Sequence, residues 1–237
     1  MGAIGAISPH GVIGGSTYKW AVKALGPLGY WRLGEASGTT AVDQMGAYNG
    51  TYVNAPTLGA AGLLAGDPTT AAVFTATQSV TTAVLPLASF SVAARVKNIP
   101  VAADTYGWIA SNGWGGVVGR WGFQLVRYRV AGGSTWYVSL MGYNGATVHS
   151  DSATLNLDGL PHLLVGTYDG TTLRVYVDGL PSGTPTVAAF TPDASLSVTL
   201  CSGSAAEGQT YQEIPIWDRA LTPGQVAMLN AIAKAAW

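Results

Sequence analysis

Short runs in which apolar and polar residues alternate dominate the middle of the chain. In residues 90–97 the larger apolar side chains occupy every second position, as they do in residues 136–140. Alternate side chains of an extended strand share one face, so each run presents an apolar face to a core. Such runs recur about every 8–12 residues between turn residues, a pattern typical of an all-β sandwich or barrel.

Two dipeptides predict tight hairpins between these strands. Asp169-Gly170 lies between the runs 162–168 and 173–177, and both residues tolerate the positive φ of a two-residue hairpin turn. Asn144-Gly145 marks another turn. The chain has no internal repeat and no linker long enough to divide it. We therefore expect one β domain that begins at about Leu28.

Helices are predicted on both sides of this domain. Ser16–Leu25 has helical apolar spacing with Ser16 as a suitable N-cap, and Gly26-Pro27 ends it. Near the other end, Thr222-Pro223-Gly224-Gln225 has the order of a capping box with proline at the first helical position. An apolar stripe at helical spacing follows and predicts a helix of about three turns: Val226, Leu229, Ile232 and Ala233.

The first 15 or so residues are rich in glycine and cannot form a core of their own. We expect an arm that is held by its own domain or by a neighbouring subunit. The expected organisation is an arm and short helix over residues 1–27, followed by a domain over residues 28–237 that ends in a helix. The candidate assembly contacts of the arm are Ile4, Ile7, His10, Val12 and Ile13.

Charged residues are scarce. They make up 10% of the chain, against about 25% in an average soluble domain. With 11 basic and 12 acidic residues the net charge is −1, so the sequence indicates neither a nucleic-acid nor a membrane partner. A surface of small polar residues has little charge repulsion to oppose association. This favours a subunit of an assembly, and the alternative is a sandwich rich in Gly, Ala and Thr without such a role.

The single Cys201 excludes an internal disulfide, and its place among alternating apolar residues predicts a half-buried, unreactive thiol.

Residues 1–10 lack the basic start of a signal peptide and are interrupted by Gly and Pro, so we expect no secretory signal. No run of 18 apolar residues predicts a membrane span.

Four segments of the chain carry a family resemblance: residues 30–35 with Asp43, Asn49-Gly50 and Thr51-Tyr52, then residues 89–92, 162–179 and 216–226. Together they resemble a laminin G-like jelly roll of the concanavalin A-like lectin/glucanase group. The resemblance covers about residues 18–232 and implies two antiparallel sheets packed as a jelly-roll sandwich. It also implies a phage context, because such domains are found in phage virion proteins.

The sequence also departs from this family. Members often carry acidic residues after the second strand, where residues 74–80 here have none. We therefore carry over no calcium ligand and expect neither metal nor cofactor. Asp169 and Asp178 are interpreted as turn residues, and Asp218-Arg219 as a local ion pair.

Catalytic residue sets are missing from the sequence. A glucanase on this fold needs two carboxylates about 5–5.5 Å apart in the retaining case, but no predicted strand carries such a pair. The alternative is a pair assembled from two distant strands. The nearest acids in sequence, Glu213 and Asp218, point to opposite faces of an extended chain. Serine-elbow, phosphate-loop and zinc-protease motifs are absent too. His10, His149 and His162 have no neighbouring His or Cys at ligand spacing, so we expect a protein that is not an enzyme.

Aromatic residues supply the candidate binding site. Three of the 8 Trp residues cluster in the glycine-rich stretch 106–121, where flat rings could stack on sugars and amides could bind hydroxyls. The alternative is that they lie in the core or in a protein interface. The same reasoning places Tyr128 in the core beside Val126, with Arg127 and Arg129 outside. The candidate residues are Trp108, Asn112, Trp114, Trp121 and Asn144.

These observations predict a non-enzymatic structural or attachment protein on the surface of a large assembly. The resemblance points to a phage virion, as a capsid decoration or tail-associated protein that is assembled in the host cytoplasm. Its expected partners are other protein subunits, either copies of itself or capsid and tail proteins. The alternative is a carbohydrate-binding module that serves adhesion or receptor binding, with a glycan as partner.

Overall fold

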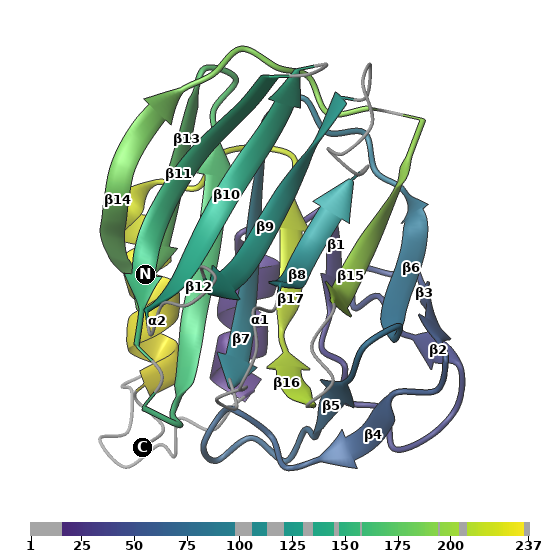
Figure 1. The fold of residues 1–237 in the computed structure, drawn as a ribbon. Helices are drawn as coiled ribbons and strands as arrows, with labels where there is room; N and C mark the ends of the chain where they lie inside the picture. The colour runs from purple at the N-terminus through teal and green to yellow at the C-terminus, as the bar shows by residue number, and fades with distance from the viewer. Residues whose placement is uncertain are drawn as a thin grey trace, which may run out of the picture.

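The protein is an antiparallel sandwich of two sheets with two helices on one side (Figure 1). The structure is a computed structural model that describes residues 16–97, 106–112, 121–129, 135–144, 147–156, 158–193, 195–203 and 208–234. The predicted arm contacts Ile4, Ile7, His10, Val12 and Ile13, together with Trp114, lie outside these residues. The predicted jelly-roll class is confirmed.

Sheet A has the order β14-β13-β12-β7-β16-β5-β4, and β17 joins its side by pairing with both β7 and β1. Its strands are β1 (Gly29–Trp31), β4 (Thr57–Ala60), β5 (Ala71–Phe74), β7 (Phe90–Lys97), β12 (Pro161–Tyr168), β13 (Thr172–Val177), β14 (Leu180–Val187), β16 (Gln209–Gln212) and β17 (Ile214–Trp217).

Sheet B has the order β11-β10-β9-β8-β15-β6-β3-β2 and faces the viewer in Figure 1. Its strands are β2 (Thr40–Ala41), β3 (Gly50–Val53), β6 (Ser79–Val84), β8 (Tyr106–Asn112), β9 (Trp121–Arg129), β10 (Trp136–Asn144), β11 (Thr147–Leu155) and β15 (Ser197–Gly203).

The main core lies between the two sheets. The alternating apolar side chains of β7 and β10 both point into it, as the sequence predicts, and Phe90 packs on Phe123 with ring centroids 4.2 Å apart. Cys201 is also buried there, and burial raises the pKa of its thiol well above the usual range. The thiol is therefore protonated at neutral pH and a poor nucleophile.

Helices α1 (Ser16–Ala24) and α2 (Pro223–Lys234) cover the outer face of sheet A (Figure 1). Tyr18 and Val22 of α1 form a second core with Leu229 of α2 and with Ala93 and Leu163 of the sheet. The helix boundaries agree with the sequence prediction to within one residue. Neither helix in the described part of the chain is long and apolar enough to cross a membrane.

The predicted capping box at the start of α2 is confirmed. The N–H of Thr222 donates to Gln225 Oε1 at 3.0 Å, and the N–H of Gln225 donates to Thr222 Oγ1 at 3.3 Å. The predicted Asp218–Arg219 ion pair is wrong. Arg219 instead donates to the carbonyl of Leu25 at 2.7 Å, because the end of α1 lies beside α2 and offers an unpaired carbonyl.

The hairpins follow the turn residues. In the β13–β14 turn, Asp178 and Gly179 have φ of 51° and 82°, the conformation that an Asp-Gly hairpin turn adopts. In the β12–β13 turn only Gly170 has positive φ, at 99°, and the carboxylate of Asp169 accepts from the N–H groups of Thr171 and Thr172. Both aspartates are turn residues, as predicted, but the two-residue form predicted at Asp169-Gly170 is wrong, because residues 169–171 lie between the two strands.

Candidate functional site

Four aromatic side chains form a continuous row on the outer face of sheet B, the face opposite the helices. Tyr106, Tyr128 and Tyr137 are in register on β8, β9 and β10, with ring centroids 5.8 and 5.4 Å apart. Trp108 stacks on Tyr106 at 6.0 Å and ends the row. The two rings that end the row, Trp108 and Tyr137, are each stacked on one partner, and of these two Trp108 lines a cavity.

The predicted orientation of β9 is wrong. Tyr128 lies on the outer face of sheet B, and Arg127 is fully buried on the inner face with its guanidinium 5.3 Å from the ring of Trp136. The prediction assumed that Val126 faces the core. Val126 points outward but is only 1% exposed, because it is in register with Trp108 and covered by the aromatic side chains around it.

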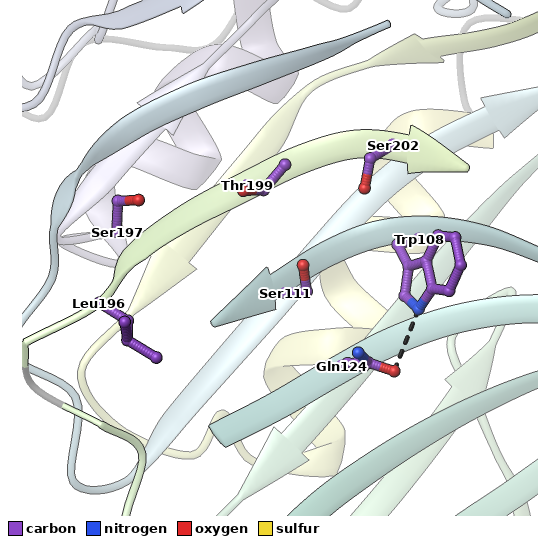
Figure 2. Close-up of a pocket in the computed structure, with 7 residues that line it drawn as sticks. All are labelled: Trp108, Ser111, Gln124, Leu196, Ser197, Thr199 and Ser202. Carbon is purple, nitrogen blue, oxygen red and sulfur yellow. Dashed lines mark hydrogen bonds between the residues drawn. The ribbon is translucent and has the colours of Figure 1, made fainter. Parts of the chain in front are cut away.

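A cavity of about 370 Å³ opens beside Trp108. Figure 2 shows the indole at one end and small polar side chains along the floor. The volume is in the range of small-ligand sites. None of the described lining residues is charged: Trp108, Ser111, Gln124, Leu196, Ser197, Thr199 and Ser202.

Gln124 fixes the indole in place. Its Oε1 accepts one hydrogen bond from Trp108 Nε1 at 3.0 Å (Figure 2) and another from the Tyr143 hydroxyl at 2.8 Å. Two bonds occupy both lone pairs of the amide oxygen. The amide nitrogen has no partner among the described residues, so it is available to donate to a ligand.

The hydroxyl groups of the cavity are also available. Ser111, Ser197, Thr199 and Ser202 make no side-chain hydrogen bond within the described part of the chain, whereas buried Ser91 and Thr82 do. A hydroxyl both donates and accepts. The cavity therefore combines one flat apolar wall with a floor of polar groups that have no side-chain partner among the described residues.

The structure separates the predicted binding residues. Trp108 lines the cavity, but Asn112 is fully buried and its Nδ2 donates to the carbonyls of Asp193 at 3.1 Å and Leu196 at 2.9 Å. Asn112 thus positions the Leu196 wall. Asn144 ends β10 and donates to the Ala189 carbonyl at 3.0 Å. Trp121 begins β9, and its side chain is outside the described part of the structure.

Sequence reasoning missed the polar floor: Ser111, Gln124, Ser197, Thr199 and Ser202. Single Ser and Thr residues carry no local signal of a site. The alternation of side chains along a strand gives only the face on which Ser111 or Gln124 lies. The pairing of β8 with β9 and with β15 brings Gln124, Ser111 and Thr199 together, and a single strand does not reveal this pairing.

The buried carboxylates of the described chain lie elsewhere. Glu213 accepts from Arg32 Nε at 2.8 Å and from the Tyr30 hydroxyl, and burial raises the pKa of its carboxyl although Arg32 acts in the opposite direction. It sits below α1 on the helix side of sheet A.

In the β5–β6 turn, where the family often has acids, Gln78 Oε1 accepts from the N–H of Thr75 at 2.7 Å. No cluster of three metal-ligating side chains occurs among the described residues.

Fold and cavity together define a lectin-type jelly roll with an open sheet face. A laminin G family model, described as the concanavalin A-like lectin/glucanases superfamily, matches residues 69–227. This is more than half of the chain, so the protein belongs to this superfamily. A search of curated protein sequences found no match.

Solved structures with the same fold include sugar-related and toxin proteins. Domain 4 of AbnA, a GH43 extracellular arabinanase from Geobacillus stearothermophilus in complex with arabinotriose, is similar with a TM-score of 0.61 and 18% identity, over 86% of this chain and 98% of that one. Trypanosoma rangeli sialidase is similar with a TM-score of 0.56 and 16% identity, over 89% and 33% of the two chains.

A botulinum neurotoxin type C structure, described as dependent on two ganglioside molecules for cell entry, has a TM-score of 0.60 and 11% identity, over 87% of this chain and 51% of that one. At these identities the likeness shows the fold alone. The chain spans about half of the neurotoxin structure and about a third of the sialidase.

Proposed function

We propose that this protein is a non-catalytic carbohydrate-binding domain that serves attachment, and that it binds its glycan on the outer face of sheet B. The observation that carries the proposal is the ring of Trp108 beside several polar groups, in a cavity whose described lining is uncharged and leaves those groups without a partner among the described residues. The apolar face of a sugar ring packs on an aromatic ring, and its hydroxyls then reach the polar floor. The arabinotriose and ganglioside contexts of structural neighbours support it.

The absence of catalysis is part of the proposal. Hydrolysis of a glycosidic bond requires a pair of carboxylates at the bond. No Asp or Glu is among the described residues that line the cavity. Binding without cleavage is therefore the activity that this lining supports.

Removal of the indole tests the proposal. In Trp108→Ala, we expect affinity for oligosaccharides to fall by about tenfold or more, which corresponds to ~1.4 kcal/mol. The probes are neutral arabino-, xylo- and gluco-oligosaccharides, measured by calorimetry. Trp20→Ala is the matched control, because Trp20 is 67% exposed on α1, on the opposite side of the molecule. Equal binding by Trp108→Ala, or no sugar binding by the natural chain, would overturn the proposal.

We also propose that the domain acts on a large assembly such as a phage virion, with copies of itself or capsid and tail subunits as protein partners. The low charged content of 10% supports association. Apolar side chains away from the cavity support it too, since Trp20, Leu180 and Val187 are 67%, 68% and 79% exposed.

Deletion of residues 1–15 tests the assembly proposal. We expect the full chain to form oligomers or to bind virion subunits in sedimentation experiments, and the shortened chain to lose this while keeping glycan binding. If both forms are monomers that bind no subunit, the proposed assembly role is wrong. The proposal of glycan binding is not affected by that result.

A further inference from the structure

A row of short polar side chains runs across sheet B at right angles to its strands. The pairing register joins each member to the next on the neighbouring strand, from β2 through β3, β6, β15 and β8 to β9. We call it the hydroxyl row: Thr40, Thr51, Thr81, Thr199, Ser111 and Gln124.

The hydroxyl row points away from the core. Ala41, Tyr52 and Val80 are the buried neighbours of its first three members, so Thr40, Thr51 and Thr81 face outward and are exposed. Thr199 and Ser111 are half-buried in the cavity floor.

Its hydroxyls have no partner among the residues that the structure describes. None of Thr40, Thr51, Thr81, Thr199 and Ser111 uses its side chain in a hydrogen bond within the described part of the chain. Exposed threonines elsewhere do, such as Thr171 with Asp169 and Thr186 with the Ser150 carbonyl. The row thus offers a series of donors and acceptors outside the cavity as well as in it.

The spacing of the row suits a chain of sugars. Neighbouring strands lie about 4.8 Å apart, so the six members span roughly 24 Å. One step is close to the length of a single sugar unit in an extended chain. The row meets the Trp108 cavity at Ser111 and Thr199 and then continues past it to the sheet edge.

We propose that the ligand is a linear, neutral polysaccharide that lies across the strands, with one unit against Trp108 and further units along the hydroxyl row toward β2. This inference rests on the proposed glycan binding. The row and the described cavity lining contain no charged side chain, so they offer no ionic partner to an acidic sugar. The aromatic row is the other path across the sheet, but its two inner rings, Tyr106 and Tyr128, are stacked on both sides and present their edges there.

The test compares ligand lengths. Neutral arabino-, xylo- and gluco-oligosaccharides of two to six units are titrated against the natural chain and against Thr51→Val/Thr81→Val, which keeps side-chain shape and removes two hydroxyls. For the series that binds, we expect the natural chain to bind six units about tenfold more tightly than two. The double variant should lose this gain and keep its affinity for two units. Thr57→Val on β4 of sheet A is the matched control and should behave as the natural chain.

Three outcomes would overturn the inference. The first is affinity that does not rise with length. The second is a length gain that survives in Thr51→Val/Thr81→Val but disappears in Thr154→Val, which lies beyond Tyr137 at the end of the aromatic row. The third is equal or tighter binding of hexagalacturonate, an anionic chain. In each of these cases, loss of sugar binding in Trp108→Ala would still support the proposed glycan-binding function. If the natural chain binds no sugar at all, both the proposed function and the inferred polysaccharide path are wrong.

Discussion

Trp108 and Gln124 lie on neighbouring strands and are joined by a hydrogen bond of 3.0 Å from the indole Nε1 to Oε1. The same oxygen accepts from the hydroxyl of Tyr143 on the next strand, β10. One amide thus connects three strands and holds the ring that forms the cavity wall. Hydrogen bonds between strands therefore fix this wall of the cavity.

Gln124→Met removes this connection with little change of volume. The buried Tyr143 hydroxyl loses its partner at Gln124, so the free energy of unfolding should fall by about 1–3 kcal/mol. Glycan affinity should fall as well, because the indole is no longer fixed. Urea unfolding and calorimetric titration measure the two effects. Gln124→Glu keeps an acceptor oxygen and should lose less stability, so equal losses in both variants would contradict this role.

Asp43 organises the turn that follows β2. Its Oδ1 accepts from the N–H groups of Tyr30 and Met45 at 2.8 and 2.9 Å, and its Oδ2 accepts from those of Ala47 and Tyr48, both at 2.9 Å. Asp43→Asn replaces one acceptor with an NH₂ group that faces N–H donors. We expect a loss of about 3 kcal/mol in unfolding free energy by chemical denaturation. Asp193→Asn, at a half-buried loop carboxylate that accepts from the N–H and hydroxyl of Ser195, should cost much less.

Two hairpin glycines with positive φ should differ in their tolerance of alanine. Gly170 has φ of 99° and open space around it, so Gly170→Ala should cost about 1–2 kcal/mol from backbone strain. At Gly179, with φ of 82°, an added Cβ would lie 2.8 Å from Asn230 Cβ and 3.3 Å from Ala227 Cα. Gly179→Ala should therefore cost about 1–3 kcal/mol more, because α2 has to move. Thermal unfolding of both variants measures the difference. Equal losses of stability would contradict this prediction and would show that α2 shifts without an energetic penalty.

His162 makes stability depend on pH. Its ring nitrogens lie 2.9 Å from Asp178 Oδ2 and 3.1 Å from Asp158 Oδ1, and the hydrogen bond to Asp178 raises the pKa of His162 although burial opposes it. Burial would raise the pKa of Asp178 too, but its bonds from His162 and from the N–H of Leu163 outweigh this and lower it. Lys234 Nζ is 3.8 Å from the same carboxylate.

The raised pKa of His162 adds stability that is complete below about pH 6.5 and is lost as the pH rises through the folded-state value. The lowered pKa of Asp178 adds stability above about pH 4 that is lost as the pH falls through its folded-state value. His162→Gln should therefore destabilise the protein by about 1 kcal/mol more at pH 5.5 than at pH 8.5. Unfolding free energies at both pH values measure this, and a loss independent of pH would contradict it.

Features that depend on neighbours in sequence could be predicted. The capping box of Thr222 and Gln225, the turn role of Asp178 and the alternating core side chains of β7 and β10 all agree with the structure. Each follows from the geometry of a single element. The prediction assigned Arg127 and Tyr128 to the wrong faces of sheet B. It failed because apolar character does not fix the face of a residue: Val126 is buried but points outward, in register with Trp108.

The sequence by itself determined the all-β class and both helices, since strand period, helix caps and turn residues act locally. The family followed from the resemblance of four segments to its members and from the matching family model. Only the tertiary structure decided where the cavity lies. Thr81, Thr199 and Ser111 are far apart in sequence, and pairing of β6, β15 and β8 brings them into one row beside Trp108. Strand order and register arise from the packing of the whole sandwich, because the apolar face of every strand must meet the same core.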